Sequence, residues 1–555
     1  MTSLVNGCLA VSAAAALLVG ALTASACSDH RNPVGGAGGQ GGVGAGGLMC
    51  WGNTGCDSSA SGVVLSCEPG GAGEIVQTCA DRTTCSLGRC VSAACAETES
   101  PTSPASIAGC LFYTAALDNI DSDDASPTLI VVTNPQQGRA MVRLEQRTDD
   151  QPLLQVWAVA QSFAIEGGRA RSFTVTSQPL QGPGYAPGVA RRIVSDQPVT
   201  VMVVQSDNRD FKANSSSGTL LLPVHALGMR YMAMTYRQNQ TDAIAQLAGA
   251  LGGAAEVAIV ATQNNTTLHI SPPGAPRDLI PTEQVLQQDG DLFQLVTDAE
   301  NNDLSGTLIT ANKPVAVFSG NVVTTYGKTA AGISTPDMAM EQMVPTTEWS
   351  KTYVAARLPA QTSACDTLFA SETTLGPVSY WRIIASDQTT LTFSWTGQLD
   401  GLPPDGMLPA TQGLPIQLVV SGEGDFVVHA SVPILMTQGM DCEASLSGAV
   451  PVDAPLGTQL FALAPAFEHA LTIVRKDGRN PPPVLLDGQD ISDMFQPADD
   501  RFSVARTVIP PCYDSVEQCV HQLAGADGLT LRGMDVTSSY ATTVTTWSKC
   551  LVDCP

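Results

Sequence analysis

The clearest concentration of residues suited to chemistry is an acidic run. Asp118, Asp121, Asp123 and Asp124 place four carboxylates within seven residues. Carboxylate oxygens are the hard ligands that Ca²⁺ prefers, but the run lacks the central glycine and terminal glutamate of a helix–loop–helix calcium loop. It predicts either a calcium-binding loop in a β protein or a solvated acidic turn. The same two interpretations apply to the shorter acidic stretches at residues 298–303 and 499–500.

No pattern in the chain predicts a catalytic centre, and we expect no catalytic residues. No H-E-x-x-H helix motif and no G-x-S-x-G turn occurs. Histidines are scattered without metal-ligand spacing at His30, His225, His269, His429, His469 and His521. A catalytic triad can be assembled from residues far apart in sequence, so a hydrolase that acts on an extracellular polymer stays an alternative.

The cysteines predict disulfides. Apart from Cys8 and Cys27 near the amino terminus, the remaining cysteines are even in number, and many fall in one short segment that has few large apolar residues. Such spacing fits a disulfide framework in an exported chain, whereas zinc usually needs C-x2–4-C pairs or a nearby histidine. The candidates are Cys50, Cys56, Cys67, Cys79, Cys85, Cys90, Cys95, Cys110, Cys365, Cys442, Cys512, Cys519, Cys550 and Cys554. Cys365 is expected to pair with Cys442, whereas connectivity within the first eight stays open.

The amino terminus predicts export. Residues 8–22 form an apolar stretch that suits a signal-peptide core and is short for a membrane span. Thr23-Ala-Ser-Ala26 then precedes Cys27, as in the cleavage box of bacterial lipoproteins, although Ala24 stands where leucine is usual and no Lys or Arg precedes the apolar core. We expect a signal peptide at 1–26, a lipidated Cys27 and a glycine-rich tether to residue 49. Secretion without lipid is the alternative.

Composition and charge narrow the class of protein. The 555 residues carry a formal net charge of −25, with 27 Lys and Arg against 52 Asp and Glu. This balance argues against nucleic-acid binding and against docking on anionic lipid. A membrane contact is therefore expected only through the lipid on Cys27. A chain of this length exceeds one hydrophobic core and predicts several domains.

One decapeptide pattern recurs along the chain, and its third copy is one residue shorter. It reads IVSDQPVTVM from Ile193, ITANKPVAVF from Ile309 and VHASVPILM from Val428, so the starts lie 116 and 119 residues apart. A period of this length predicts tandem domains. Short β-branched runs separated by turn residues fill each period and favour an all-β fold of antiparallel β-sandwich-like modules. A β-propeller is the alternative.

The expected organisation follows from this period and from the cysteine spacing. A disulfide-rich module at 50–109 precedes β modules at 110–225, 226–350, 351–454 and 455–555. A second repeat, Ile259-Val-Ala-Thr-Gln-Asn-Asn-Thr-Thr-Leu268 and Ile383-Ile-Ala-Ser-Asp-Gln-Thr-Thr-Leu391, predicts a hairpin in each of two modules. Trp157, Trp349, Trp381 and Trp395 are candidates for a glycan platform, and most of them are expected in the core.

Several motifs in order resemble one family. The segments 217–228, 258–270, 306–320 and 337–345 are similar to the IgGFc-binding protein amino-terminal domain family, and the cysteine ladder at 79–95 resembles its bacterial lipoprotein members. The resemblance implies a β-rich binding protein without known catalytic residues. We therefore expect a non-enzymatic binding or adhesion protein, lipid-anchored at the outer membrane or cell surface, with a protein or glycan ligand. A passive structural spacer is a further alternative.

Overall fold

The computed structural model describes the chain in segments, and residues 37–555 group into one compact unit. The described residues are 43–44, 48–51, 54–57, 60, 62–67, 73–100, 106–119, 126–147, 157–177, 179–180, 182–206, 216–238, 253–273, 282–299, 302–324, 337–357, 378–385, 389–395, 407–410, 416–421, 424–440, 446–449, 459–463, 468–477, 481–509, 516–525, 529–536 and 541–545. The signal peptide and Cys27 lie outside them.

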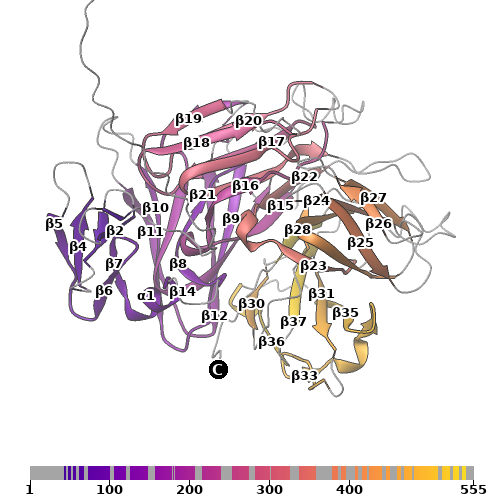
Figure 1. Cartoon of the computed structure of the whole chain (residues 1–555). Helices are drawn as coiled ribbons and strands as arrows, with labels where there is room; N and C mark the ends of the chain where they lie inside the picture. The colour runs from indigo at the N-terminus through magenta and orange to yellow at the C-terminus, as the bar shows by residue number, and fades with distance from the viewer. Residues whose placement is uncertain are drawn as a thin grey trace, which may run out of the picture. The chain divides into compact units, whose positions relative to one another are not determined.

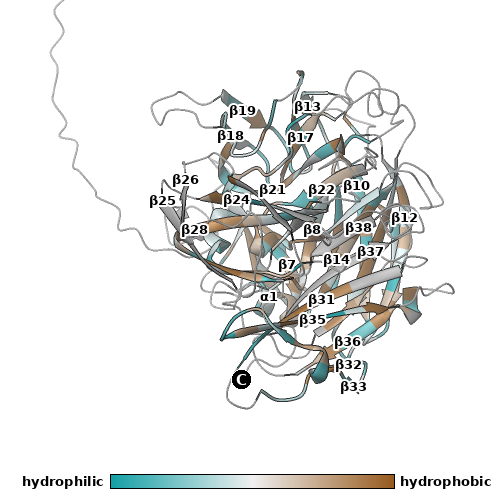
Figure 2. Ribbon diagram, turned by 90° about the vertical axis from the view of Figure 1, so that its right-hand side faces the viewer, coloured by the Kyte–Doolittle hydropathy of each residue, from teal (hydrophilic) through white to brown (hydrophobic). Residues whose placement is uncertain are grey.

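Antiparallel β-sheets account for nearly all regular structure in these segments (Figure 1). The one α-helix among them is α1 (Ala93–Thr98), which Ser92 caps by accepting a hydrogen bond from the Cys95 amide. Hydrophobic residues line the strands and alternate with polar ones in many of them (Figure 2). The prediction of an all-β fold is confirmed. The sheets are open and do not form propeller blades, so the propeller alternative is wrong.

A small disulfide-rich module begins the described chain. It contains β1 (Val43–Gly44), β2 (Leu48–Trp51), β3 (Thr54–Cys56), β4 (Val63–Ser66), β5 (Ile75–Thr78), β6 (Thr83–Ser86) and β7 (Arg89–Ser92). Disulfides join Cys56 to Cys85, Cys79 to Cys90 and Cys95 to Cys110, and Cys67 is also disulfide-bonded. The core of this module that contains Val91 is tiny, so crosslinks must supply much of its stability.

The first repeat follows, and its centre is one long strand. The strands are β8 (Gly109–Thr114), β9 (Ser126–Asn134), β10 (Ala140–Arg147), β11 (Trp157–Ile165), β12 (Arg169–Ser177), β13 (Gly184–Ala186), β14 (Arg191–Ser206) and β15 (Ser216–Leu221). The first half of β14 pairs with β10 and β8, whereas the second half pairs with β9 and β15. β14 therefore belongs to two layers and turns a corner between them.

The second repeat has the same pairing around β21. Its elements are η1 (Val224–Ala226), β16 (Gly228–Met232), β17 (Ala255–Ala261), β18 (Thr266–Ser271), β19 (Thr282–Leu286), β20 (Leu292–Val296), β21 (Leu308–Thr324) and β22 (Asp337–Gln342). The first part of β21 pairs with β18 and β16, and the later part pairs with β17 and β22. β13 of the first repeat adds to this sheet beside β20.

The third repeat is built alike around β28. It contains η3 (Thr346–Glu348), β23 (Ser350–Ala355), β24 (Val378–Ala385), β25 (Thr389–Trp395), β26 (Met407–Ala410), β27 (Ile416–Ser421), β28 (Phe426–Met440) and β29 (Ser447–Gly448). β25 and β23 pair with the first half of β28, and β24 and β29 pair with the second half.

The fourth repeat has two shorter strands, β36 (Val520–Ala524) and β37 (Leu529–Val536), in place of a single long strand that pairs in two layers. The other elements are β30 (Gln459–Ala462), β31 (Glu468–Lys476), β32 (Leu485–Leu486), β33 (Gln489–Asp490), η4 (Ser492–Met494), β34 (Gln496–Pro497), β35 (Phe502–Ile509), η5 (Val516–Gln518) and β38 (Ala541–Thr545). β36 pairs with β30 and β32, and β37 pairs with β31 and β38. The domain boundaries drawn from the sequence stay predictions.

The recurring decapeptide is the corner itself. In β14, Val194 and Val199 both pair with strand β8. The four residues between them, 195–198, have no pairing partner on β8. The matching residues of β21 and β28 are skipped by β16 and β23. Each skipped stretch ends in a proline, which has no N–H to offer a ladder. The repeated sequence therefore marks where the strand leaves one layer for the other.

The predicted hairpin at the second repeat motif is wrong. β17 pairs with residues 315–321 of β21 and β18 pairs with residues 308–311, so both run antiparallel to the same long strand. They follow β21 around its corner, and β24 and β25 do the same along β28. The polar turn between them accommodates this bend, with Asn265 at a φ of 52°. A hairpin and a bent strand share the same local sequence signal.

The hydrophobic cores are shared between repeats. Along β17, Val257 and Ile259 face one cluster, whereas Ala258 and Val260 face another that also contains residues of the first and fourth repeats, such as Val142 and Ile473. A strand buried on both faces must pack against two layers. Trp349 and Trp381 are buried as expected. The side chain of Trp395 lies outside the described residues.

A buried tyrosine fastens the corner in two repeats. The Tyr231 hydroxyl donates to the carbonyl of Val315 at 2.8 Å and accepts from the Gly228 amide at 2.8 Å. The Tyr353 hydroxyl likewise donates to the carbonyl of Ile434 at 2.8 Å and accepts from the Ser350 amide at 3.2 Å. In each case the carbonyl belongs to the residue directly after the corner proline. The matching position of the first repeat is Phe112.

We expect Tyr353→Phe to destabilise the protein by about 1–3 kcal/mol, because the change leaves a buried amide and a buried carbonyl without this partner. The matched control is Tyr185→Phe, because Tyr185 is exposed enough for water to replace its bond to Asp291. Urea unfolding of both variants measures the difference. Equal losses of stability would show that the buried hydroxyl does not hold the corner.

Candidate functional site

A group of polar and aromatic side chains surrounds Asp289, in the loop between β19 and β20. We define the Asp289 cluster as Tyr113, Glu145, Arg147, Trp157, Arg192 and Asp289. Oδ2 of Asp289 accepts hydrogen bonds from Trp157 Nε1 at 2.7 Å, Tyr113 Oη at 3.3 Å and Arg192 Nη1 at 3.4 Å. Oδ1 of Asp289 pairs with Arg147. The Asp289 carboxylate of the second repeat is therefore held by four strands of the first, β8, β10, β11 and β14.

Strand register explains why these side chains meet. Arg147 lies opposite Trp157 across β10 and β11, and Arg192 lies opposite both Glu145 and Tyr113 across the first half of β14. Directly opposed residues on one sheet face are close enough to interact. Glu145 accepts from Arg192 Nε at 2.6 Å. The result is a charged pair across β10 and β14, with an aromatic residue opposite each arginine on the next strand.

Trp157 lies between two guanidinium groups. The guanidinium carbon of Arg192 is 4.3 Å from the ring centroid, and that of Arg147 is 5.1 Å from it. Both distances suit cation–π attraction. Tyr113 packs its edge against the same ring at a centroid separation of 6.0 Å. The indole is thereby fixed in orientation, with its N–H committed to Asp289.

The cluster reaches from the core to the surface. The side chain of Arg147 is 4% exposed, those of Asp289 and Arg192 are 19% and 24% exposed, and the neighbouring Arg143 is 51% exposed. Burial first, and then the charge of Asp289, raises the pKa of Tyr113 far above its ordinary value, so its hydroxyl stays a donor. The arrangement offers guanidinium donors at a rigid edge. It suits recognition of a carboxylate or a polar backbone rather than covalent chemistry.

Two further Arg–Asp pairs join neighbouring repeats. Arg382 of β24 pairs with Asp303, which precedes β21, at 2.7 Å and also donates to the backbone carbonyl of Thr235. Arg506 of β35 pairs with Asp425, which precedes β28, and also donates to the carbonyl of Arg357 at 2.8 Å. Arg147 follows the same rule, since it donates to the carbonyl of Asp289 at 2.6 Å as well as to its carboxylate. One arginine thus bonds both backbone and side chain of the neighbouring repeat at each junction.

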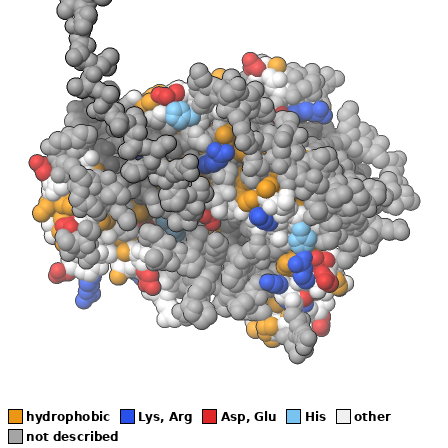
Figure 3. All heavy atoms as spheres, viewed as in Figure 1, with side chains coloured by type: hydrophobic (Ala, Val, Ile, Leu, Met, Phe, Trp, Pro, Cys, Tyr) orange, Lys and Arg blue, Asp and Glu red, His pale blue; other side chains and the backbone are white. Residues whose placement is uncertain are grey.

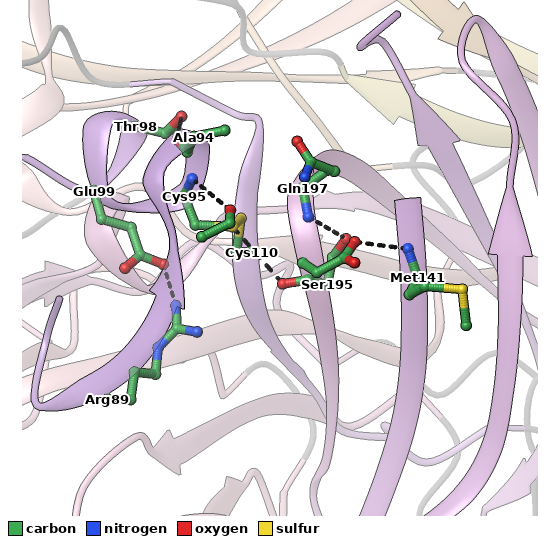
Figure 4. Close-up of a disulfide and its surroundings, with 11 residues drawn as sticks. Arg89, Ala94, Cys95, Thr98, Glu99, Cys110, Met141, Ser195 and Gln197 are labelled. Carbon is green, nitrogen blue, oxygen red and sulfur yellow. Dashed lines mark hydrogen bonds and ion pairs between the residues drawn. A yellow bond between two sulfur atoms is a disulfide. The ribbon is translucent and has the colours of Figure 1, made fainter. Parts of the chain in front are cut away.

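The disulfide module meets the first corner directly. The Cys95–Cys110 bridge joins α1 to β8, and Cys95 Sγ lies 3.8 Å from the carbonyl oxygen of Ser195 in the corner of β14 (Figure 4). On the side of α1 away from Ser195, Figure 4 also shows Glu99 paired with Arg89. The side chain of Asp196, next to Ser195, accepts from the Met141 amide at 2.7 Å. The module is therefore fastened at the point where the first long strand changes layer.

Most of the residues predicted from sequence as calcium ligands lie outside the part of the chain that the structure describes, so the calcium loop stays a prediction. Asp118 is buried, whereas Asp121, Asp123 and Asp124 lie outside the described residues. Among the described residues no group of three or more His, Cys, Asp or Glu side chains is placed to hold a metal. Of the smaller acidic stretches, Asp303 is paired with Arg382, and both Asp499 and Asp500 lie near Arg501.

The described histidines serve separate roles. The ring nitrogens of the half-buried His225 are buried, and this burial lowers its pKa to about 4. His269 faces Glu283 at 3.8 Å, His429 contacts Arg501 at 2.6 Å and His521 pairs with Asp487 at 2.7 Å. His30 and the side chain of His469 lie outside the described residues. No two of the described histidines converge on one point.

The remaining cysteine predictions also fall largely outside the described residues. Cys519 is disulfide-bonded. Nothing is described for Cys27, for Cys365 and Cys442, or for Cys512, Cys550 and Cys554, nor for the side chain of Cys50. Within the described segments, no helix has the length and apolar character needed to cross a membrane.

Sequence reasoning identified only Trp157 of the Asp289 cluster. Arg143, Glu145 and Arg147 alternate along β10 and so share one sheet face, which is a readable signal for a charged stripe. Nothing in the sequence connects this stripe with Asp289. Basic and acidic side chains intermingle on the face seen in Figure 3, without a large patch of one sign among the described residues.

A pH-dependent stability is expected from the Arg382–Asp303 pair. Burial alone would raise the pKa of Asp303, but the Arg382 charge and hydrogen bonds from Arg382 and Ser305 outweigh it and lower that pKa. A carboxyl with a lowered folded-state pKa adds stability above its unfolded pKa of about 3.9, and this stability is lost as the pH falls through the folded value. We expect Asp303→Asn to cost about 3 kcal/mol at pH 7, because it leaves a buried guanidinium without its charge partner.

The cost of Asp303→Asn should shrink below about pH 4, because the wild-type carboxyl then becomes neutral as well. Urea unfolding at pH 7, 5 and 3 measures it. The exposed Asp298 in the same loop gives the control Asp298→Asn, for which we expect only a small loss of stability at pH 7. A loss from Asp303→Asn that stays constant between pH 7 and pH 3 would rule out the ion pair as its source.

Comparison with known proteins places this architecture in a family. The model of the IgGFc-binding protein family matches residues 217–548, which is more than half of the chain. The human IgGFc-binding protein is 25% identical over 256 residues, which cover 46% of this chain but only 4% of the human protein. The matched region starts inside β15 and takes in the second, third and fourth repeats, with their long strands β21 and β28. This chain belongs to the IgGFc-binding protein family.

Proposed function

We propose that this chain is a non-enzymatic binding protein that holds a protein ligand at the cell envelope. The observation that carries the proposal is the family match over 217–548, because the family is one of binding proteins. The human relative is named for binding the Fc part of IgG. The chain matches only 4% of the length of that relative. Antibody binding is therefore one of the possibilities to be tested, and the proposal does not depend on it.

The surface of the Asp289 cluster suits a protein ligand. Arginine, tryptophan and tyrosine are the residue types that most often dominate the energy of protein interfaces. Here Arg192 and Arg143 present guanidinium groups at the surface, while Arg147, Trp157 and Asp289 fix the layer beneath them. A fixed supporting layer reduces the entropy lost on binding.

Export and lipid anchoring form the second part of the proposal. The apolar stretch at 8–22, the small residues before Cys27 and the glycine-rich segment that follows support a lipidated amino terminus with a tether. Disulfides in the module after the tether are typical of an oxidising compartment.

Binding is tested with residues 37–555 as bait against envelope extract, culture fluid and purified IgG Fc. We expect one defined protein to be retained, and Arg143→Ala combined with Arg192→Gln to weaken its binding by about tenfold or more, a loss typical of an interface hot spot. Arg139→Ala is the control, because the side chain of Arg139, just before β10, is 59% exposed and lies outside the Asp289 cluster. Retention of nothing above a blank resin would favour the passive spacer.

Lipid anchoring is tested in the native host with Cys27→Ser. We expect the protein to move from the membrane fraction to the soluble fraction, because no other anchor is predicted. Cys8→Ser is the control and should leave the protein in the membrane fraction. A Cys27→Ser protein that stays with the membrane would contradict the proposed anchor.

A further inference from the structure

A buried carboxylate lies where the first and second repeats meet. Glu256 of β17 is fully buried, and its Oε2 accepts a hydrogen bond from the backbone amide of Asp118 at 3.0 Å. Its other oxygen, Oε1, is buried and has no hydrogen-bond partner among the described residues. Ionised carboxylates are rarely buried unless a cation or several hydrogen bonds compensate them. Within the described segments Glu256 accepts one hydrogen bond, at Oε2, so an ionised Glu256 needs a further partner to compensate its charge.

The surrounding residues bring a second carboxylate to the same place. Gln205 of β14 holds the segment before Asp118, because its side chain accepts from the Leu117 amide at 3.0 Å and donates to the Leu117 carbonyl. Asp118 itself is buried, and Oδ1 of its carboxylate accepts from the Asn119 amide at 3.0 Å. Among the described residues, Asp118 is the charged group that acts on Glu256, and it repels a negative charge there. Two acidic side chains from two repeats therefore converge in the interior.

We propose that a calcium ion binds between Glu256 and Asp118 and joins the first repeat to the second. Both residues offer carboxylate oxygens, the ligands that Ca²⁺ prefers, and backbone carbonyls and water would supply the others. Mg²⁺ demands a stricter octahedron and dehydrates reluctantly, so a buried site of this kind favours Ca²⁺.

A proton on Glu256 is the competing way to remove the charge. Burial and the charge of Asp118 raise the pKa of Glu256 well above its ordinary value, which agrees with either solution. The two solutions differ at Oε1. A proton there would be a buried donor without an acceptor, whereas a cation satisfies the oxygen directly. The unpartnered Oε1 therefore favours the cation.

The proposal is tested on residues 37–555 after treatment with EGTA. Calorimetric titration with CaCl₂ should show binding, and a hundredfold excess of Ca²⁺ over Kd should raise the Tm by about 3 °C or more. The same titration with MgCl₂ should show weaker binding than the titration with CaCl₂. Glu256→Gln should abolish the calcium-dependent rise in Tm. Asp118→Asn keeps the backbone N–H that donates to Glu256 and should weaken Ca²⁺ binding at least tenfold.

The matched control is Glu283→Gln, the same change at an exposed position on β19, at the edge of the same sheet. It should leave the response to Ca²⁺ unchanged. The wild-type titration stands even if Glu256→Gln fails to fold. No calcium-dependent change in the wild-type protein, or a response retained in both Glu256→Gln and Asp118→Asn, would overturn the proposal and leave a protonated Glu256.

Discussion

The structure depends on how a long β-strand turns from one layer to the next without leaving its backbone unsatisfied. At each corner, four residues ending in a proline leave the ladder on one side. Buried amides and carbonyls that lose ladder partners must find others. Asp196 and Asn312, in matching positions, each accept from the amide of the second residue of the strand beside them, Met141 and Thr267. In the first two repeats, this position of the decapeptide therefore supplies a side-chain acceptor for a backbone amide of the adjacent strand.

The corner also explains why the repeats form one body. A strand that passes between layers presents both faces to apolar neighbours, and β17 contributes alternate side chains to two different cores. The Arg–Asp pairs act at the same junctions. Buried ion pairs stabilise weakly once desolvation is counted, but breaking one is costly. Arg147, Arg382 and Arg506 therefore act mainly to select how one repeat docks on the next.

Much of the fold could be predicted from sequence because its signals are local or periodic. The period near 116 residues, the β-branched runs and the cysteine-rich segment each have a direct physical meaning. The hairpin prediction was wrong because a polar turn after a buried strand is compatible with reversal and with a bend. Long-range pairing to β21 decides between them. Similarly, Cys85 and Cys90 face each other across β6 and β7, yet they pair with Cys56 and Cys79.

The candidate site could not be predicted because Asp289 lies far along the chain from Tyr113, Trp157 and Arg192, and only the docking of two repeats brings them together. That docking is tested most directly by hydrogen exchange of residues 37–555 under native conditions. If the cores are shared, the amides of β14, β17 and β21 should lose protection together in one cooperative opening. If β21 exchanged fully while β14 kept its protection, the repeats would be independent domains and the shared-core account would be contradicted.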